Sequence, residues 1–177
     1  MGPHAGESER EIFNRKTEDI SRTGKTFWLN RSYRAKPIMV QRLCEEAQRE
    51  KSDCFCIFIE GGAVPIASDE SAKQYSKDGL TWYDLPKGLT PVTGKIDSGA
   101  HAPVFDRLER MNNLIYVDLW NYGEFFDQKL PLKTRQGAST ICAIKKDMSA
   151  HEEKMIARWR RIVAAGKLCE PFCVYLR

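Results

Sequence analysis

The stretch Cys54–Tyr75 reads CFCIFIEGGAVPIASDESAKQY and joins an apolar run, a glycine turn, a second apolar run and a polar segment. Cys54–Ile59 is short and rich in Phe, Ile and Cys, a composition typical of a buried strand. Gly61–Gly62 marks a turn, after which Ala63–Ala67 fits the returning strand of a hairpin. We therefore expect a strand pair that delivers the polar segment to one edge of a sheet.

The polar segment is expected to open a short helix over Ser68–Ser76. A helix N-terminus favours anions, and the carboxylates of Asp69 and Glu70 are ligands that suit Mg²⁺ or Mn²⁺ against a phosphodiester. Lys73 can neutralise charge that develops on the phosphate, which makes Asp69, Glu70 and Lys73 the candidate catalytic residues. The alternative is an ordinary surface helix on which Ser68 or Asp69 serves only as the cap.

The chain has 177 residues and a formal charge of +4, which permits nucleic-acid binding without arguing for it. Residues 1–25 contain few apolar side chains, so we expect a mobile or loosely attached segment before a single domain over 26–177. No apolar run is long enough for a transmembrane segment, and no signal peptide is evident. These features predict a cytoplasmic protein, with its six cysteines filling core.

The remaining elements alternate between strand and helix patterns, which predicts an α/β or α+β class with a mixed sheet and flanking helices. The expected strands are Thr26–Leu29, Leu114–Trp120, Thr140–Ile144 and Phe172–Leu176. The expected helices run from Pro37 to about Lys51, from Pro103 to about Met111, and from Ser149 to Gly166. The last of these carries a capping box and an apolar face that includes Trp159 and Ile162.

Basic residues gather in three places, and each gathering is either a nucleic-acid contact or an ordinary solvated surface. They are Arg31, Arg34 and Lys36 before the first helix, Lys133 and Arg135 in a loop, and Arg158, Arg160 and Arg161 on the last helix. Phosphate contacts supply most nonspecific affinity for nucleic acids, so these basic residues would bind a nucleic-acid strand if they lay close together in the fold.

Two further motifs give weaker evidence for a functional site. Thr23–Thr26 ends like a phosphate-binding P-loop, but it lacks the first glycine and the helix that this motif needs. His101 lies in a Gly/Pro-rich loop near Asp97 and Asp106 and is a candidate general base, although no nucleophile pattern accompanies it.

The order of the predicted elements along the chain is further evidence beside these single residues. The strand FWL, the link NRSYRAKP, the helix VQRLCEEAQ, the strand CFCIFI, the turn EGGA, the strand VPIA and the helix start SDESAK follow one another. This order resembles the ParB/sulfiredoxin superfamily, in which a strand pair ends in a loop of the type Asp-Gly-x-x-Arg. Asp69 matches the acidic position, Glu70 replaces glycine, and Lys73 stands where arginine is expected. In that superfamily the loop engages nucleotide phosphates or supports phosphodiester cleavage.

Within the superfamily the chain is similar to plasmid fertility-inhibition factors, particularly over residues 12–43. The resemblance implies DNase and ATPase activity directed at the DNA strand transferred through a type IV secretion system. It implies DNA, ATP and a divalent metal as ligands, and secretion or relaxosome components as partners, which can bring the protein to the inner membrane. Phosphates would meet Ser68, Ser71, Lys133 and Arg135, and DNA would meet Arg34, Arg158 and Arg161. The alternative is a noncatalytic adaptor that binds DNA or protein and occludes a component of the transfer machinery.

Overall fold

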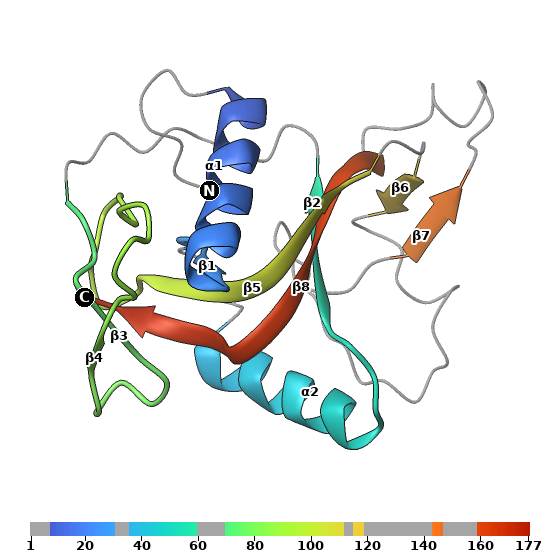
Figure 1. Cartoon of the computed structure of the whole chain (residues 1–177). Coiled ribbons are helices and arrows are strands. Elements are labelled where there is room, and N and C mark those ends of the chain that lie inside the picture. The colour runs from blue at the N-terminus through green and yellow to red at the C-terminus, as the bar shows by residue number, and fades with distance from the viewer. Residues whose placement is uncertain (1–7, 31–35, 60–69, 112–114, 119–142, 147–158) are drawn as a thin grey trace. The chain divides into compact units, whose positions relative to one another are not determined.

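The computed structural model describes residues 8–30, 36–59, 70–111, 115–118, 143–146 and 159–177. The helices in these ranges are α1 (Glu9–Thr23) and α2 (Pro37–Arg49). The strands are β1 (Thr26–Phe27), β2 (Phe55–Ile59), β3 (Gln74–Ser76), β4 (Tyr83–Asp84), β5 (His101–Arg110), β6 (Ile115–Asp118), β7 (Ala143–Lys146) and β8 (Trp159–Leu176). The chain is therefore an α+β protein (Figure 1).

The strand pairs whose register is described are all antiparallel, so they do not form the mixed sheet that the sequence predicts. The chain divides into two compact units. Unit 1 comprises residues 1–56, 62–108 and 166–177, and unit 2 comprises residues 57–61 and 109–165. The strand β8 therefore contributes its first residues to unit 2 and its last residues to unit 1.

The sheet of unit 1 follows the order β1-β5-β8-β3-β4, and β2 also pairs with β8. Figure 1 shows α1 and α2 on opposite sides of the β5 and β8 ribbons. The core is built from small and β-branched residues of these strands, together with Phe27 and Leu29 from the β1 segment. Within the described residues, neither helix is long and apolar enough to cross a membrane.

The helix α1 is absent from the sequence prediction, which treats residues 1–25 as loosely attached. Its ends are nevertheless fixed locally. Ser8 and Glu11 form a capping box, and Gly24 closes the other end in the left-handed conformation, donating its N–H to Ile20 over 2.8 Å. Ile12 is buried, so the helix packs on the body of unit 1.

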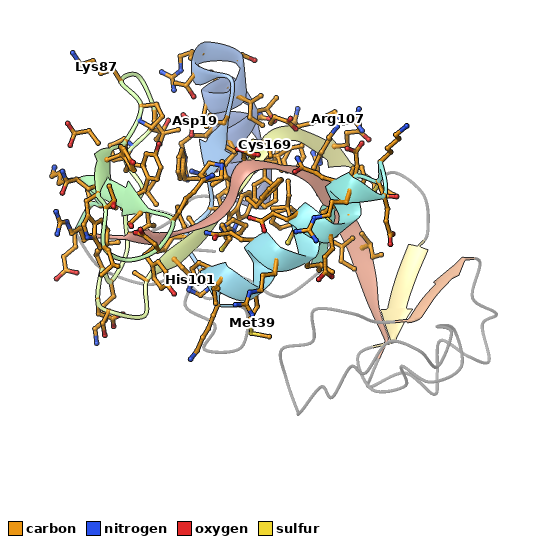
Figure 2. The ribbon with its side chains drawn as sticks, turned by 90° about the horizontal axis from the view of Figure 1, so that it is seen from below. Asp19, Met39, Lys87, His101, Arg107 and Cys169 are labelled. Atoms are coloured by element: carbon orange, nitrogen blue, oxygen red, sulfur yellow. The ribbon has the colours of Figure 1, made fainter. Side chains whose placement is uncertain are left out.

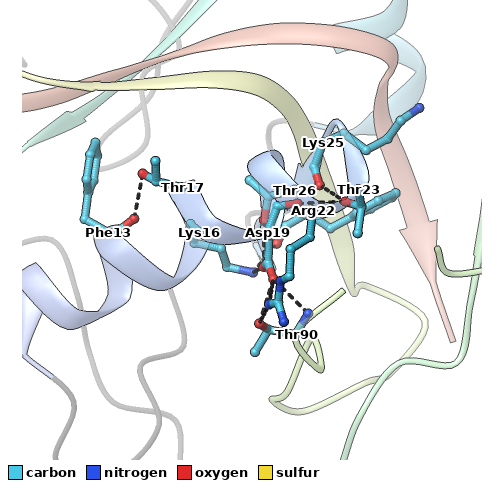
Figure 3. Close-up of polar contacts among 10 residues, drawn as sticks. Phe13, Lys16, Thr17, Asp19, Arg22, Thr23, Lys25, Thr26 and Thr90 are labelled. Atoms are coloured by element: carbon cyan, nitrogen blue, oxygen red, sulfur yellow. Dashed lines mark hydrogen bonds and ion pairs between the residues drawn. The ribbon is translucent and has the colours of Figure 1, made fainter. Parts of the chain in front are cut away.

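Asp19 anchors α1, and its carboxylate is fully buried. Thr90 donates its N–H and hydroxyl to Oδ1 over 2.8 and 2.6 Å, and Thr26 donates its hydroxyl to Oδ2 over 3.1 Å (Figure 3). Arg22 forms an ion pair with the same carboxylate at 3.1 Å, and Lys16 forms another at 3.6 Å. One side chain therefore joins a helix, a strand and a loop 71 residues further along the chain.

The helix α2 is confirmed, and Pro37 occupies its first turn as predicted. Cys44 is buried against the sheet, and Gln41 donates from Nε2 to the carbonyl of Cys173 in β8 over 2.6 Å. The apolar residues Val40, Leu43, Cys44 and Ala47 recur at helical spacing, which predicts one buried face, but Leu43 is 50% exposed. The strands expected at the start of Thr26–Leu29 and within Cys54–Ile59 are also confirmed.

The helix expected from Pro103 is wrong, because His101–Arg110 forms the strand β5. Val104 and Leu108 are spaced four residues apart, which suits one face of a helix, but in β5 both are buried against other strands. Pairing of Thr26 with Phe105 and of Phe27 with Val104 fixes this strand from a distant part of the chain. Nonlocal backbone pairing therefore overrides the local pattern.

The last predicted helix is also wrong over the part that the structure describes, because Trp159–Leu176 is the strand β8. Gly166, expected to end the helix, lies within the strand. A Cβ atom at Gly166 would come within 2.6 Å of the Phe105 ring and 2.8 Å of Leu108, so glycine is needed there for close packing. The capping residues Ser149 and Glu152 lie outside the described residues.

We predict that Asp19→Ala lowers the free energy of unfolding by about 3–5 kcal/mol, because it leaves the buried ammonium of Lys16 without its carboxylate and removes the acceptor of Thr26 and Thr90. Chemical denaturation followed by circular dichroism measures the loss. Glu18→Ala is the matched control, since Glu18 is exposed on the same helix and its removal should change stability by less than about 0.5 kcal/mol. Equal effects of the two changes would contradict the anchoring role of Asp19.

Candidate functional site

The clearest gathering of charge and aromatic residues lies in the sheet of unit 2. The strand β6 is central there and pairs antiparallel with β7 on one side and β8 on the other. Tyr116 of β6 lies opposite Lys145 of β7 and also opposite Arg161 of β8. Residues opposite each other in antiparallel pairs share a face, so these three form one row across the sheet.

A second row lies two residues along on the same face. Asp118 of β6 lies opposite Ala143 and opposite Trp159. We call the face made by these two rows the basic face, and its members are Lys145, Tyr116, Arg161, Ala143, Asp118 and Trp159. Neighbouring strands are about 4.8 Å apart, so the row of Tyr116 sets two cationic residues roughly 10 Å apart with an aromatic residue between them.

The opposite face of these strands has a different character. Ile115, Val117 and Ile144 alternate with the residues of the basic face and therefore share the other face. Along β8 the same alternation leads to Ile162 and Ala164, which are both buried. By the same register, Lys146 and Arg160 also share this face, at the outer strands.

The sequence expectation for a phosphate site falls partly outside the described residues. The predicted site residues that lie outside the described ranges are Ser68, Asp69, Arg34, Lys133, Arg135 and Arg158. Arg161 is described as a strand residue of β8, and it is the predicted DNA contact that the structure places in a row with other candidates.

The helix predicted over Ser68–Ser76 is wrong from residue 70 onward. Ser71 forms an antiparallel bridge with Thr93, and Ala72 donates its N–H to the carbonyl of Val92 over 3.0 Å. Ala72 is buried, and the following residues Gln74–Ser76 form β3. The described part of this segment is extended, so it does not present a row of helix N-terminal amides to a phosphate.

Glu70 and Lys73 are consequently separated. Glu70 accepts the N–H of Ile96 at Oε2 over 2.9 Å. The N–H of Lys73 donates to the carbonyl of Arg177 over 2.7 Å, and its side chain is exposed. Residues three apart share a side of a helix but face opposite sides of an extended segment, so this backbone does not bring Glu70 and Lys73 together.

The metal expected at Asp69 and Glu70 receives limited support from the chain. Among the described residues, no group of three or more His, Cys, Asp or Glu side chains is placed to hold a metal ion. Glu70 is the one predicted ligand that lies in the described ranges, and one of its carboxylate oxygens already accepts the N–H of Ile96. The donor set for Mg²⁺ therefore depends on Asp69.

His101 is buried at the start of β5 and is poorly placed as a general base. Its Nδ1 lies 3.0 Å from the carbonyl of Gly99, so Nδ1 carries the proton and donates. Its Nε2 is buried without a hydrogen-bond partner in the described structure. Burial lowers the pKa of His101 below 6.5, and the bond to Gly99 opposes that shift.

A cavity of about 400 Å³ in unit 1 lies between α2 and β8. Cys44, Cys54 and Cys169 line it, and an ion pair of 2.9 Å joins Lys167 to Asp53 at its wall. Burial raises the pKa of the Cys169 thiol to about 11 and that of Cys44 still further, so both thiols are protonated at neutral pH. Protonation disfavours nucleophilic chemistry at both thiols; Cys44 fills core as predicted, whereas Cys169 is only half-buried. Figure 2 marks Cys169 on β8.

Comparisons of the chain with protein-family models, with characterised proteins and with solved structures return no match. The basic face was missed at the level of sequence, because Trp159 and Arg161 were assigned to a helix. The signal was present in IYVD, where Ile115 and Val117 alternate with Tyr116 and Asp118 as in a strand whose two faces differ in character.

We predict that His101 makes the stability of the protein fall as the pH drops below about 6.5. The folded-state pKa is lowered, so the contribution is complete above 6.5 and is lost as the pH falls, because the unfolded chain binds the proton more tightly. The free energy of unfolding should fall with a slope approaching about 1.4 kcal/mol per pH unit from this one group. Urea denaturation at a series of pH values measures it.

His101→Asn is the comparison, since its amide nitrogen can still donate to Gly99 but does not titrate in this range. The two proteins should differ in slope whatever their absolute stabilities. A variant that keeps the wild-type slope would assign the pH dependence to other groups.

Proposed function

We propose that the protein acts on DNA and that the basic face of unit 2 binds it. The observation that carries the proposal is the row in which Tyr116 lies between Lys145 and Arg161. Lysine and arginine side chains are long enough to reach phosphates on either side of a bound strand, and the intervening tyrosine suits a base or a sugar.

The second part of the proposal concerns chemistry. We propose that the segment around Asp69 and Glu70 hydrolyses phosphodiester bonds with Mg²⁺ or Mn²⁺ and that the protein binds and hydrolyses ATP. This part is supported by the order of elements that resembles the ParB/sulfiredoxin superfamily and by the match of Asp69 to its acidic position. When bound, the metal would supply charge for the phosphate, and Glu70 would be oriented by its bond to Ile96.

The setting that follows from the resemblance is plasmid fertility inhibition in the bacterial cytoplasm. A protein that binds and cleaves the transferred DNA strand would prevent that DNA from entering a type IV secretion system. Secretion or relaxosome components would then be partners that bring the protein to its substrate at the inner membrane. The basic face supports the DNA-binding step of this scheme.

An exposed apolar surface on α2 favours a second candidate, a noncatalytic adaptor that binds a protein of the transfer machinery. Ile38, Met39 and Leu43 are between 45% and 59% exposed on one side of the helix, and Figure 2 shows Met39 on the outer side of α2. Protein interfaces draw on such apolar surface. This candidate predicts that inhibition of DNA transfer survives neutralisation of the basic face and is lost in Met39→Glu.

We predict that Lys145→Ala and Arg161→Ala each weaken DNA binding and reduce its dependence on salt, because each removes a phosphate contact. Each should reduce the slope of log K against log salt by about 1. Fluorescence anisotropy of labelled oligonucleotides at several salt concentrations measures both quantities.

The chain offers neighbours of the same type as controls. Lys146→Ala and Arg160→Ala remove identical charges one residue away, on the opposite face of the sheet. They should leave affinity and salt slope close to wild type. If all four variants lose affinity equally, net charge and not the basic face accounts for binding.

We predict that Asp69→Ala abolishes Mg²⁺-dependent cleavage of DNA while leaving DNA affinity unchanged, because the proposed phosphate contacts of Lys145 and Arg161 do not require the metal. Gel assays of single- and double-stranded DNA, with and without Mg²⁺ and ATP, measure the cleavage. Asp78→Ala is the control, since this carboxylate is occupied by the N–H groups of Leu80 and Thr81. Cleavage that persists in Asp69→Ala would remove the site assignment.

A further inference from the structure

Two cysteine side chains of unit 1 meet at the cavity between α2 and β8. Cys44 is a buried residue of α2, whereas Cys54 directly precedes β2 and is partly exposed. Both residues line the cavity, and their thiols lie within hydrogen-bonding range of each other. Both thiols are free, so the pair is a dithiol with one member open to small molecules.

The backbone around both cysteines is held by the same strand, β8. Gln41 lies three residues before Cys44 and donates from Nε2 to the carbonyl of Cys173 over 2.6 Å. The carbonyl of Cys54 accepts the N–H of Leu168 over 2.9 Å. Because both hydrogen bonds end on β8, the fold itself brings the two thiols together.

The other cysteines near this cavity are less well placed to react with Cys44. Cys169 lines the same cavity, but among the neighbours that shift the pKa of its thiol the carboxylate of Asp106 contributes most, after burial. Cys173 is buried, and its influence on the pKa of Cys44 is weaker than that of Cys54. Cys54 is therefore the partner that combines contact with access.

We infer that Cys44 and Cys54 form an oxidation site at which hydrogen peroxide converts the dithiol into a disulfide. In the first step the sulfur of Cys54 attacks the peroxide. An S–O bond forms, the O–O bond breaks, and the departing oxygen leaves as water with the thiol proton. The product at Cys54 is a sulfenic acid, which condenses with a neighbouring thiol.

In the second step the sulfur of Cys44 attacks the sulfur of the sulfenic acid at Cys54. The S–S bond forms, the S–O bond breaks, and the hydroxyl leaves as a second water with the proton of Cys44. The two thiols together lose two electrons and two protons, and one hydrogen peroxide becomes two waters. The site requires no other co-reactant.

The surroundings of the two sulfurs suit this order of steps. Burial, and next the neighbouring Cys54 thiol, raise the pKa of Cys44, so Cys44 carries its proton at neutral pH. A protonated thiol is a slow nucleophile toward a free oxidant, which leaves the first step to the more exposed Cys54. In the second step, contact replaces nucleophilic strength, and the proton of Cys44 is the one that the leaving hydroxyl needs.

The disulfide would tie the inward side of α2 to the start of β2. It closes the loop that joins these two elements, and such a link restricts the unfolded chain. The inference is independent of the proposed function, because it requires neither DNA nor a metal ion.

The test maps disulfides in the full chain after treatment with hydrogen peroxide. The protein is reduced, freed of reductant, oxidised, alkylated with N-ethylmaleimide and digested with trypsin, which cuts after Arg49 and Lys51 and so separates Cys44 from Cys54. Mass spectrometry without reductant should find these two peptides joined, and dithiothreitol should separate them. We expect this link to form at least about tenfold faster than any other cysteine pair, because its thiols are held in contact.

Matched variants identify the sulfurs. The tryptic peptide that contains Cys54 also contains Cys56, so Cys54→Ser should abolish the link while Cys56→Ser retains it. Cys169→Ser is a second control, since Cys169 lines the same cavity and its loss should leave the rate of linking within about twofold of wild type. If a variant does not fold, fragment ions that separate Cys54 from Cys56 in the wild-type peptide give the same assignment.

Three results would overturn the inference. The first is a link from Cys44 to Cys169 or Cys173 that forms faster than the link to Cys54. The second is oxidation of Cys54 to the sulfinic acid without a disulfide, which would show that Cys44 does not reach it. The third is a full set of alkylated, unoxidised cysteines after peroxide treatment.

Discussion

The buried carboxylate of Asp19 is the constraint on which unit 1 depends. Its two oxygens accept three hydrogen bonds from Thr26 and Thr90, while Arg22 and Lys16 supply the opposite charge. A charge this deep is tolerated only when every acceptor site is used, so the helix, the strand and the loop must all be in place together. The loop so fixed continues to Val92 and Thr93, which pair with Ala72 and Ser71. The positions of Ser71 and Ala72 thus follow from an interaction made about 50 residues earlier in the chain.

The two units use charge in opposite ways. In unit 1 the charges of Lys16 and Asp19 are buried, paired and saturated, so they specify packing and are not available to a ligand. In unit 2 the cationic residues Lys145 and Arg161 lie in different strands with an aromatic residue between them, and no acidic residue shares their row. The first arrangement suits a structural role and the second suits a polyanion. The net charge of +4 does not distinguish between these two arrangements of charged residues.

Elements set by local pattern were predictable from the sequence: α2, from its proline start and apolar spacing, and β2 and β6, from their β-branched and aromatic runs. The helix α1 was missed because its buried residues include the charged Lys16 and Asp19, so the spacing of apolar residues does not indicate a buried helix face. Its ends were nevertheless marked in the sequence by Ser8, Glu11 and Gly24. β5 and the first part of β8, up to Gly166, were predicted as helices because their apolar residues also fit a 3.6-residue period, whereas the strand expected over Phe172–Leu176 is confirmed. Their true state is decided by pairing between segments about 60 residues apart, which one sequence does not display.

The same error explains why the sequence prediction groups Arg161 with Arg158 and not with Tyr116 and Lys145. On a helix, Arg158 and Arg161 would share a side because they are three residues apart, and Arg160 would lie near them. On the strand β8 the period is two, so Arg161 shares a face with Trp159 and is separated from Arg160. The register then adds Tyr116 and Lys145, which no spacing within one segment could supply. The residues that share a site across three strands are determined by the register of those strands. If one strand is predicted as a helix, nearly all of the residues assigned to the site change, although the chemistry of each residue stays the same.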